Sequence, residues 1–194
     1  MNNKIYALIG PHACGKGDII KRLAGLGIHY IASYTTRPPV ETHTSVPIYH
    51  FVSKEDFLQK DFLVKSTYKG DYYGFLKKDI LDSLQEYPIS VILVDTISLK
   101  QLSKLLKDSF ESIFVMCDYV SLVERMLKLG HTNSEIKYHL EYAENNGEFD
   151  TWKVTTHIIK SLASEERMTA QALAIMGLCQ RLPGEEFNLR IRRR

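Results

Sequence analysis

A short glycine-rich stretch with one lysine follows an apolar run near the N-terminus and limits the folds open to this chain. Glycines let the backbone curl so that successive N–H groups point at one anion, and the start of a helix adds partial positive charge. The flanking segments are a strand predicted at 4–9 and a helix predicted at 19–26. We therefore predict a nucleotide phosphate-binding loop, with a plain strand-to-helix turn as the alternative. The loop residues are Gly10, Pro11, His12, Ala13, Cys14, Gly15, Lys16, Gly17 and Asp18.

The end of this loop departs from the usual pattern. Lys16 is placed to reach the terminal phosphates of a nucleotide, but Gly17 stands where a serine or threonine hydroxyl normally binds Mg²⁺. Glycine has no hydroxyl to offer the ion. The sequence leaves open whether water-mediated Mg²⁺ binding, with help from Asp95, replaces that contact.

The rest of the chain alternates short apolar runs with helical patterns. We predict strands at 89–94, 113–117 and 154–159, and helices at 119–129, 133–144 and 165–178. This alternation is typical of an α/β fold with a mostly parallel central sheet covered by helices. Between residues 34 and 74 the pattern changes to short aromatic strands, at 49–52, 62–68 and 72–75, which indicates a small inserted β-rich subdomain.

Composition excludes several classes of protein. With 194 residues, 44% hydrophobic and 25% charged, the chain fits one globular domain. The longest apolar runs fall far short of the roughly eighteen residues that cross a bilayer, and the N-terminus lacks the apolar core of a secretory signal, so we expect a cytoplasmic protein. A net charge of +2 predicts no nucleic-acid partner, and no membrane partner is expected. The basic end at 190–194 is expected to be solvated, with contact to an anionic partner as the alternative. The oligomeric state is not predicted.

The chain has three cysteines, Cys14, Cys117 and Cys179, at wide spacing. This suits reduced thiols better than a disulfide framework or a zinc site, and no metal cage is expected from the sequence. A helix N-terminus would favour the thiolate of Cys14. We therefore hypothesise that its oxidation or alkylation blocks nucleotide binding, with an unreactive small loop residue as the alternative.

Five motifs in order resemble the guanylate kinase family over most of residues 4–160. They are the phosphate loop, Ser33-Tyr34-Thr35-Thr36-Arg37-Pro38-Pro39, Tyr49-His50-Phe51, Gly70-Asp71-Tyr72-Tyr73-Gly74 and Val91-Ile92-Leu93-Val94-Asp95. The resemblance implies a P-loop kinase with a core at about 1–32, 76–123 and 148–182, an acceptor-binding insert at about 33–75, a helical lid at about 124–147 and a basic tail at about 183–194. It also implies ATP and Mg²⁺ as cofactors, and transfer of the terminal phosphoryl group of Mg-ATP to GMP.

The same resemblance implies roles for individual residues. Lys16 would hold the ATP phosphates, and Arg125 matches the first arginine of the lid. Arg37 and Asp95 would lie at the acceptor, Asp95 also near the metal. The implied catalytic residues are Lys16, Arg37 and Arg125, and the implied acceptor-binding residues are Ser33, Arg37, Tyr49, Tyr73 and Asp95. The alternatives are a surface arginine at 37, core aromatics at 49 and 73, a helix cap at 95 and a solvated helix charge at 125.

Several family positions are changed in this chain. Val64 and Phe75 replace the glutamate and serine that read guanine in the family. Valine offers no acceptor, and a buried donor left unpaired costs about 1–3 kcal/mol, which weakens the case for GMP. Other changes are Val40, Leu129 and His139 at arginine positions and Ser161 at an asparagine position. Protonated His139 could replace a lid arginine, but a lone histidine on a helix is more often a surface residue.

These changes leave two alternatives to a guanylate-kinase-like enzyme. One is a kinase of another phosphorylated acceptor, such as a ribose bisphosphate. The other is a catalytically impaired relic of the fold that binds a nucleotide or a protein. The retained glycine-lysine loop favours nucleotide binding.

Overall fold

The computed structural model of the chain describes residues 3–39, 47–161 and 164–179. Val40 and the predicted tail at 183–194 therefore lie outside the described residues. The chain divides into a first unit, Met1–Ala7 with Ile20–Glu111, and a second unit, Leu8–Ile19 with Ser112–Arg194. Strand β1 (Lys4–Ile9), helix α1 (Lys16–Gly25) and strand β8 (Phe110–Met116) contribute residues to both units.

The larger sheet has the strand order β2-β7-β1-β8-β9. Its pairs β2–β7 and β8–β9 are parallel. Side chains such as Ile5, Ile92 and Ile113 are fully buried, as expected for parallel strands that are covered on both faces. The prediction of a mostly parallel central sheet is confirmed.

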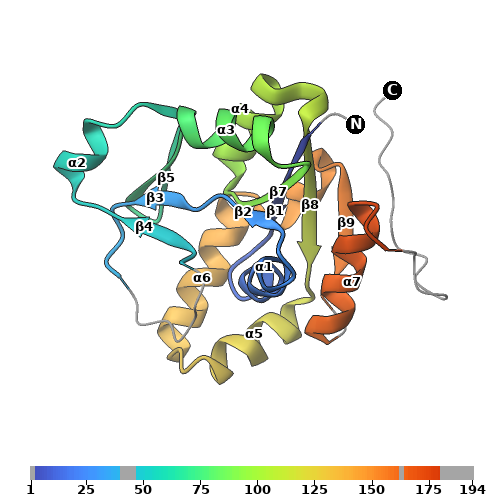
Figure 1. Ribbon diagram of the computed structural model, residues 1–194. Helices are drawn as coiled ribbons and strands as arrows, with labels where there is room; N and C mark the ends of the chain where they lie inside the picture. The colour runs from blue at the N-terminus through green and yellow to red at the C-terminus, as the bar shows by residue number, and fades with distance from the viewer. Residues whose placement is uncertain (1–2, 40–46, 162–163, 180–194) are drawn as a thin grey trace. The chain divides into compact units, whose positions relative to one another are not determined.

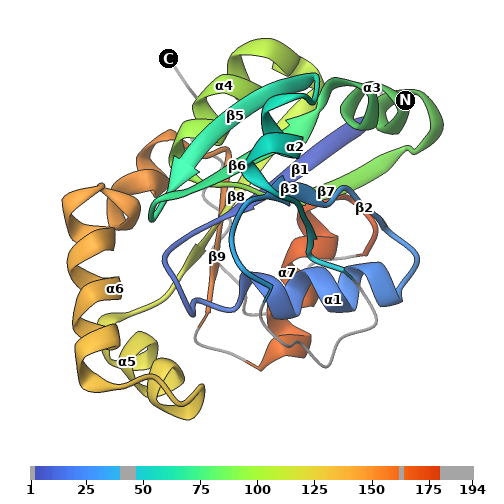
Figure 2. The same cartoon turned by 90° about the vertical axis from the view of Figure 1, so that its left-hand side faces the viewer.

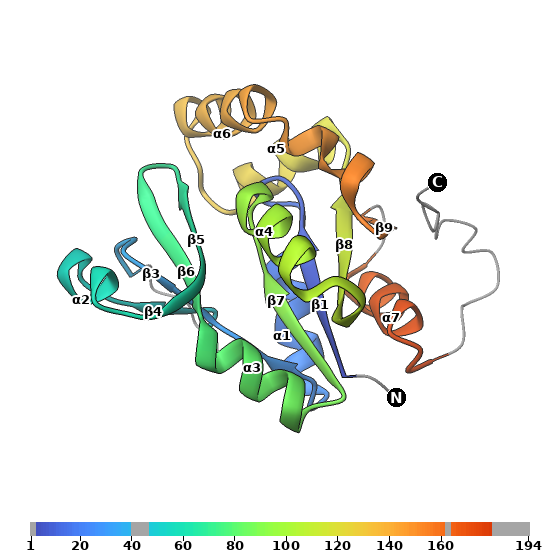
Figure 3. The same cartoon turned by 90° about the horizontal axis from the view of Figure 1, so that it is seen from above.

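The first unit also contains a smaller sheet of order β4-β3-β6-β5. Its long hairpin of β5 and β6 is drawn in teal in Figure 3. Lys69 and Gly70 join the two strands with φ of 52° and 89°, values that suit a tight two-residue hairpin turn. The elements of this unit are β2 (His29–Tyr30), β3 (Ser33–Thr35), β4 (Tyr49–Phe51), α2 (Lys54–Leu58), β5 (Phe62–Tyr68), β6 (Asp71–Leu76), α3 (Lys77–Glu86), β7 (Ile89–Leu93), α4 (Thr96–Leu106) and the 3₁₀ helix η1 (Lys107–Ser109).

The second unit is mainly helical and contains the parallel pair β8–β9. Helix α6 follows α5 after a short turn (Figure 2), and α7 lies beside β9 (Figure 1). Thr132 and Glu135 form a reciprocal capping box that starts α6. The elements are β8 (Phe110–Met116), α5 (Tyr119–Lys128), α6 (Asn133–Asn145), the 3₁₀ helix η2 (Glu148–Val154), β9 (His157–Lys160) and α7 (Glu165–Ile175). No helix in the described part of the chain is long and apolar enough to cross a membrane.

The structure contains elements that were not predicted, among them β2, β3, α2 and α3, and it shifts the ends of others. Helix α1 begins at Lys16 instead of residue 19, and the last strand begins at His157 instead of residue 154. The β-branched residues before His157 suggested a strand. Instead, the backbone N–H and hydroxyl of Thr155 both donate to the carbonyl of Trp152, and these local bonds end η2 where the strand was expected.

Candidate functional site

The loop between β1 and α1 has the curled backbone predicted from its glycines. A Cβ atom on Gly10 would lie 2.7 Å from the carbonyl oxygen of Val115, so only glycine fits there. Gly15 has φ of +99°, and Ala13 has φ of 61°. Because α1 starts directly after this curl, the loop has the geometry that binds phosphate groups at a helix N-terminus.

The ammonium group of Lys16 lies across this loop. Its Nζ atom donates hydrogen bonds to the carbonyl oxygens of Gly10 at 2.6 Å and Pro11 at 2.7 Å. Nζ also contacts Sγ of Cys14 at 3.5 Å, so all three donors of the ammonium group point at the loop and hold the charge in place. The structure thus places the cation of the loop beside the curled backbone, and its contact with the phosphates of a nucleotide stays a prediction.

Burial removes the basis for a reactive Cys14. Its side chain has no exposed surface, whereas reactive cysteines are at least partly exposed. The hypothesis that oxidation or alkylation of Cys14 in the folded protein controls nucleotide binding is therefore not supported. Its position fits the alternative of a small residue packed inside the loop.

Arg125, on α5, is tied to the phosphate loop through Ser161. Its Nη1 atom donates to the Ser161 hydroxyl at 2.7 Å, and Nη2 donates to the Ser161 carbonyl at 2.9 Å. The buried Ser161 hydroxyl in turn donates to the carbonyl of Cys14 at 2.7 Å. The alternative of a solvated helix charge is therefore wrong. The guanidinium group braces the loop and adds positive charge beside it.

One face of the smaller sheet carries most of the predicted acceptor residues. Ser33 pairs with Tyr49 and Thr35 pairs with Tyr73, and directly opposed residues share a face. The rings of Tyr49 and Tyr73 meet edge to face at 5.8 Å, and the guanidinium carbon of Arg37 lies 5.9 Å from the Tyr49 ring centroid. The structure thus brings the predicted arginine and two phenols together, with Ser33 buried beneath them in the sheet.

The phenol of Tyr49 is a proton donor at neutral pH. Its pKa is raised to about 12, chiefly by burial, with smaller contributions from Tyr73 and Asp95, which raise it, and from Arg37, which lowers it. A protonated phenol beside a guanidinium group is a suitable hydrogen-bond donor for a phosphate oxygen.

Asp95 acts as the N-cap of α4. Its Oδ1 atom accepts from the backbone N–H groups of Ile97 at 2.8 Å and Ser98 at 2.9 Å. Its Oδ2 atom accepts from the hydroxyl groups of Ser66 and Ser98. The helix-cap alternative is therefore confirmed, and the role of Asp95 toward an acceptor or a metal stays a prediction.

Ser66 is a polar residue of this face that sequence reasoning missed. It lies opposite Tyr73 and is buried, and its hydroxyl donates to Asp95. The signal was the alternation along β5, where Val64 and Ser66 are buried and Lys65 is exposed. A serine on the buried side of an alternating strand has to find a polar partner, which is the Asp95 carboxylate here.

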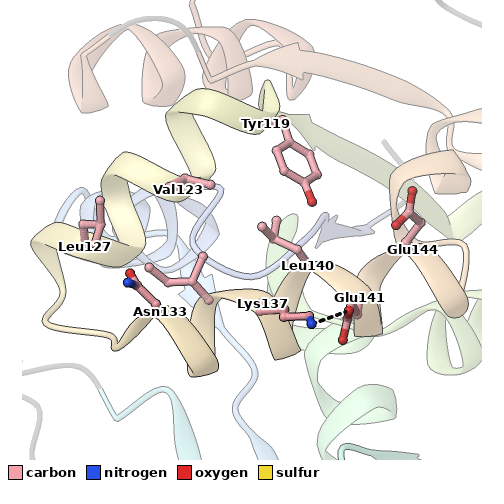
Figure 4. Close-up of a pocket in the computed structure, with 9 residues that line it drawn as sticks. Tyr119, Val123, Leu127, Asn133, Lys137, Leu140, Glu141 and Glu144 are labelled. Carbon is pink, nitrogen blue, oxygen red and sulfur yellow. Dashed lines mark ion pairs between the residues drawn. The ribbon is translucent and has the colours of Figure 1, made fainter.

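A separate groove of about 400 Å³ lies between α5 and α6 (Figure 4). Apolar side chains, including Val123 and Leu140, line its centre. An ion pair of 3.7 Å between Lys137 and Glu141 lies at its edge. None of the predicted site residues lines it.

Comparisons with known proteins agree with the order of motifs. A family model described as guanylate kinase matches residues 2–167. A guanylate kinase of Mycoplasmopsis pulmonis is 30% identical over 178 residues, covering 83% of this chain and 90% of that protein. A guanylate kinase of a Nostoc species is 25% identical over 141 residues, covering 70% and 71%. A crystal structure of guanylate kinase from Anaplasma phagocytophilum is similar with a TM-score of 0.65 at 16% identity, covering 92% of this chain and 87% of that one, and it bears on the fold alone.

Proposed function

Because this chain belongs to the guanylate kinase family, we propose that it is a kinase that moves the terminal phosphoryl group of ATP to a nucleoside monophosphate. The observation that carries the proposal is the curled glycine loop with the ammonium group of Lys16 held across it. The acceptor face with Arg37, Tyr49 and Tyr73 supports the second half of the reaction.

Phosphoryl transfer depends mainly on alignment of the two substrates and on stabilisation of their negative charge, and little on covalent catalysis. The bond from the terminal phosphorus of ATP to its bridging oxygen breaks, and a bond to an oxygen of the acceptor phosphate forms. The loop N–H groups and Lys16 would hold the ATP phosphates. Arg37 would bind the acceptor phosphate with its planar fork, and the protonated phenols would donate further hydrogen bonds. Arg125 would add charge beside the loop, where Ser161 holds it.

Neither of the two positions expected near the metal, Gly17 and Asp95, offers Mg²⁺ a free protein ligand. Gly17 lacks a hydroxyl, and both carboxylate oxygens of Asp95 already accept hydrogen bonds. Mg²⁺ commonly keeps several waters and is bound by substrate phosphates. We therefore propose that the ion arrives with ATP, and we assign no step to a protein-bound Mg²⁺.

We expect Gly17→Ser to tighten Mg-ATP binding by about 3- to 10-fold, since one added metal contact of about 1 kcal/mol corresponds to this range. Gly17→Ala is the matched control, because both substitutions favour the helix over glycine and only serine adds a hydroxyl. Titration calorimetry with and without Mg²⁺ separates the two effects. Equal Mg-ATP affinity of the two variants would show that position 17 lies out of reach of the ion.

The base-reading positions favour a broadened acceptor specificity. Val64 and Phe75 pair in register between β5 and β6, and each is only 2% exposed. Neither side chain can accept a hydrogen bond from the N1–H or amino group of guanine. We propose that the protein accepts GMP with little preference over other nucleoside monophosphates. The same apolar pair supports a second candidate, a ribose bisphosphate, which has no base to read.

ADP release from Mg-ATP tests the proposal across GMP, dGMP, AMP, CMP, UMP and ribose bisphosphate. We expect turnover with GMP, and kcat/KM within about tenfold for at least one other monophosphate, because lost contacts worth about 1–3 kcal/mol remove most discrimination. Turnover with ribose bisphosphate alone would favour the second candidate. Absence of turnover with every acceptor would contradict both and favour a binding relic.

A further inference from the structure

Three histidines from separate segments meet in the second unit. His12 lies in the phosphate loop, His131 in the turn after α5, and His139 on α6. The Nε2 atoms of His12 and His131 are 3.3 Å apart, and the rings of His12 and His139 stack at 4.0 Å. One ring nitrogen from each of the three lies within 4.8 Å of the others. This is the one group of at least three potential metal ligands in the described part of the chain.

We propose that His12, His131 and His139 form a binding site for a divalent transition metal of the zinc class, which joins the phosphate loop to α6. The proposal does not depend on kinase activity. It differs from the expectation drawn from the cysteines, because the ligands are imidazoles that lie far apart in the sequence.

The distances between the histidine rings suit such a site. A tetrahedral zinc ion with Zn–N bonds of about 2.0–2.1 Å separates two ligand nitrogens by about 3.3 Å. The Nε2 atoms of His12 and His131 already have this separation. The ring of His139 has to turn out of its parallel stack on His12, because a metal lies in the plane of each ring that binds it. Without metal, a proton shared between the two Nε2 atoms accounts for their contact.

A carboxylate lies behind one of the three histidines, at ion-pair distance and not at hydrogen-bond distance. Nε2 of His131 faces the cluster, while its Nδ1 lies 3.9 Å from a carboxylate oxygen of Glu135. The same oxygen accepts hydrogen bonds from the backbone and hydroxyl of Thr132, which fix it at the start of α6. A carboxylate behind a ligating imidazole holds the ring's orientation and raises its basicity.

The ligand set predicts which ions bind. Imidazole suits Zn²⁺, Co²⁺ and Ni²⁺, whereas Mg²⁺ and Ca²⁺ prefer oxygen ligands. Three protein ligands also leave a fourth position open on a tetrahedral ion. We therefore expect binding of the three transition metals and none of Mg²⁺ at the same site.

Metal titration of the untagged protein tests the site directly. We expect one Zn²⁺ per chain by calorimetry, and Co²⁺ to give visible absorption of a tetrahedral complex without a thiolate charge-transfer band. His131→Ala and His139→Ala should each weaken binding at least about tenfold, the lower end of the loss seen for outer-shell changes. His139→Gln is a second variant, and circular dichroism verifies the fold of all three.

His50→Ala is the matched control. His50 is an exposed histidine of β4 in the first unit, so its removal should leave zinc affinity unchanged. Absence of Zn²⁺ and Co²⁺ binding at millimolar concentration, unchanged affinity in folded His139 variants, or a Co²⁺ spectrum with a thiolate band would each overturn the proposal.

Discussion

Lys16→Ala is expected to weaken ATP binding by at least about 100-fold, because hydrogen bonds to charged groups contribute about 1.5–3 kcal/mol each and the lysine would exchange two of its loop contacts for two phosphate oxygens. The loop N–H groups alone cannot replace this charge. The geometry that supports the expectation is the ammonium group held between the carbonyls of Gly10 and Pro11. Titration calorimetry with Mg-ATP measures the loss directly.

The control for this variant is Lys21→Ala on the same helix, which should bind ATP like the unchanged protein. Because Lys16 also satisfies two loop carbonyls, urea unfolding of both variants has to accompany the binding data. A Lys16→Ala protein that is folded and still binds ATP would refute the assignment of the phosphate loop.

Arg37→Ala is expected to lower kcat/KM for the acceptor by about 100- to 1,000-fold, since a bidentate charge-assisted contact contributes about 3–4 kcal/mol. ATP affinity should not change, because Arg37 belongs to the acceptor face with Tyr49 and Tyr73. Arg37→Lys should recover only part of the activity, because an ammonium group lacks the planar fork of arginine. Steady-state kinetics at saturating ATP gives both ratios.

The matched control is Arg22→Ala on α1, which we expect to retain full activity. The two predictions distinguish the ATP site from the acceptor site. Lys16→Ala is expected to weaken ATP binding, and Arg37→Ala is expected to lower kcat/KM for the acceptor. Loss of ATP binding in a folded Arg37→Ala protein would contradict this division. If the Arg37→Ala protein kept the full kcat/KM for the acceptor, Arg37 would be a surface arginine with no role in acceptor binding.

Several strands of this protein were predictable from short-range pattern, whereas β2 and β3, of two and three residues, were not predicted. The strands expected at 4–9 and 62–68 match β1 and β5 at both ends. The phosphate loop was predictable for the same reason, because a glycine requirement and a helix start are properties of a few consecutive residues. The strand expected at 154–159 was partly wrong where the bonds from Thr155 to Trp152 outweighed β-branched propensity.

Side-chain partners were less predictable than backbone elements. The sequence allowed Asp95 to be an acceptor-site residue or a helix cap. In the structure its carboxylate accepts four hydrogen bonds from three residues, two of them from backbone N–H groups at the start of α4. It also excluded the alternative of a solvated charge for Arg125 by pairing this residue with Ser161, 36 positions away. Such partners depend on which elements pack together, a choice that no local spacing encodes.

The residues themselves were sufficient for the fold class, the loop and the family resemblance, because each rests on local propensity or on the order of short motifs. The tertiary structure was needed for the burial of Cys14, the Ser66 contact to Asp95 and the histidine cluster. His12 and His131 are 119 positions apart, and their 3.3 Å contact exists only because folding brings the loop and the turn before α6 together. Secondary structure depends on interactions among neighbouring residues, which the sequence shows directly. The chemistry of a site depends on side chains from distant segments, which only the packing of the chain brings together.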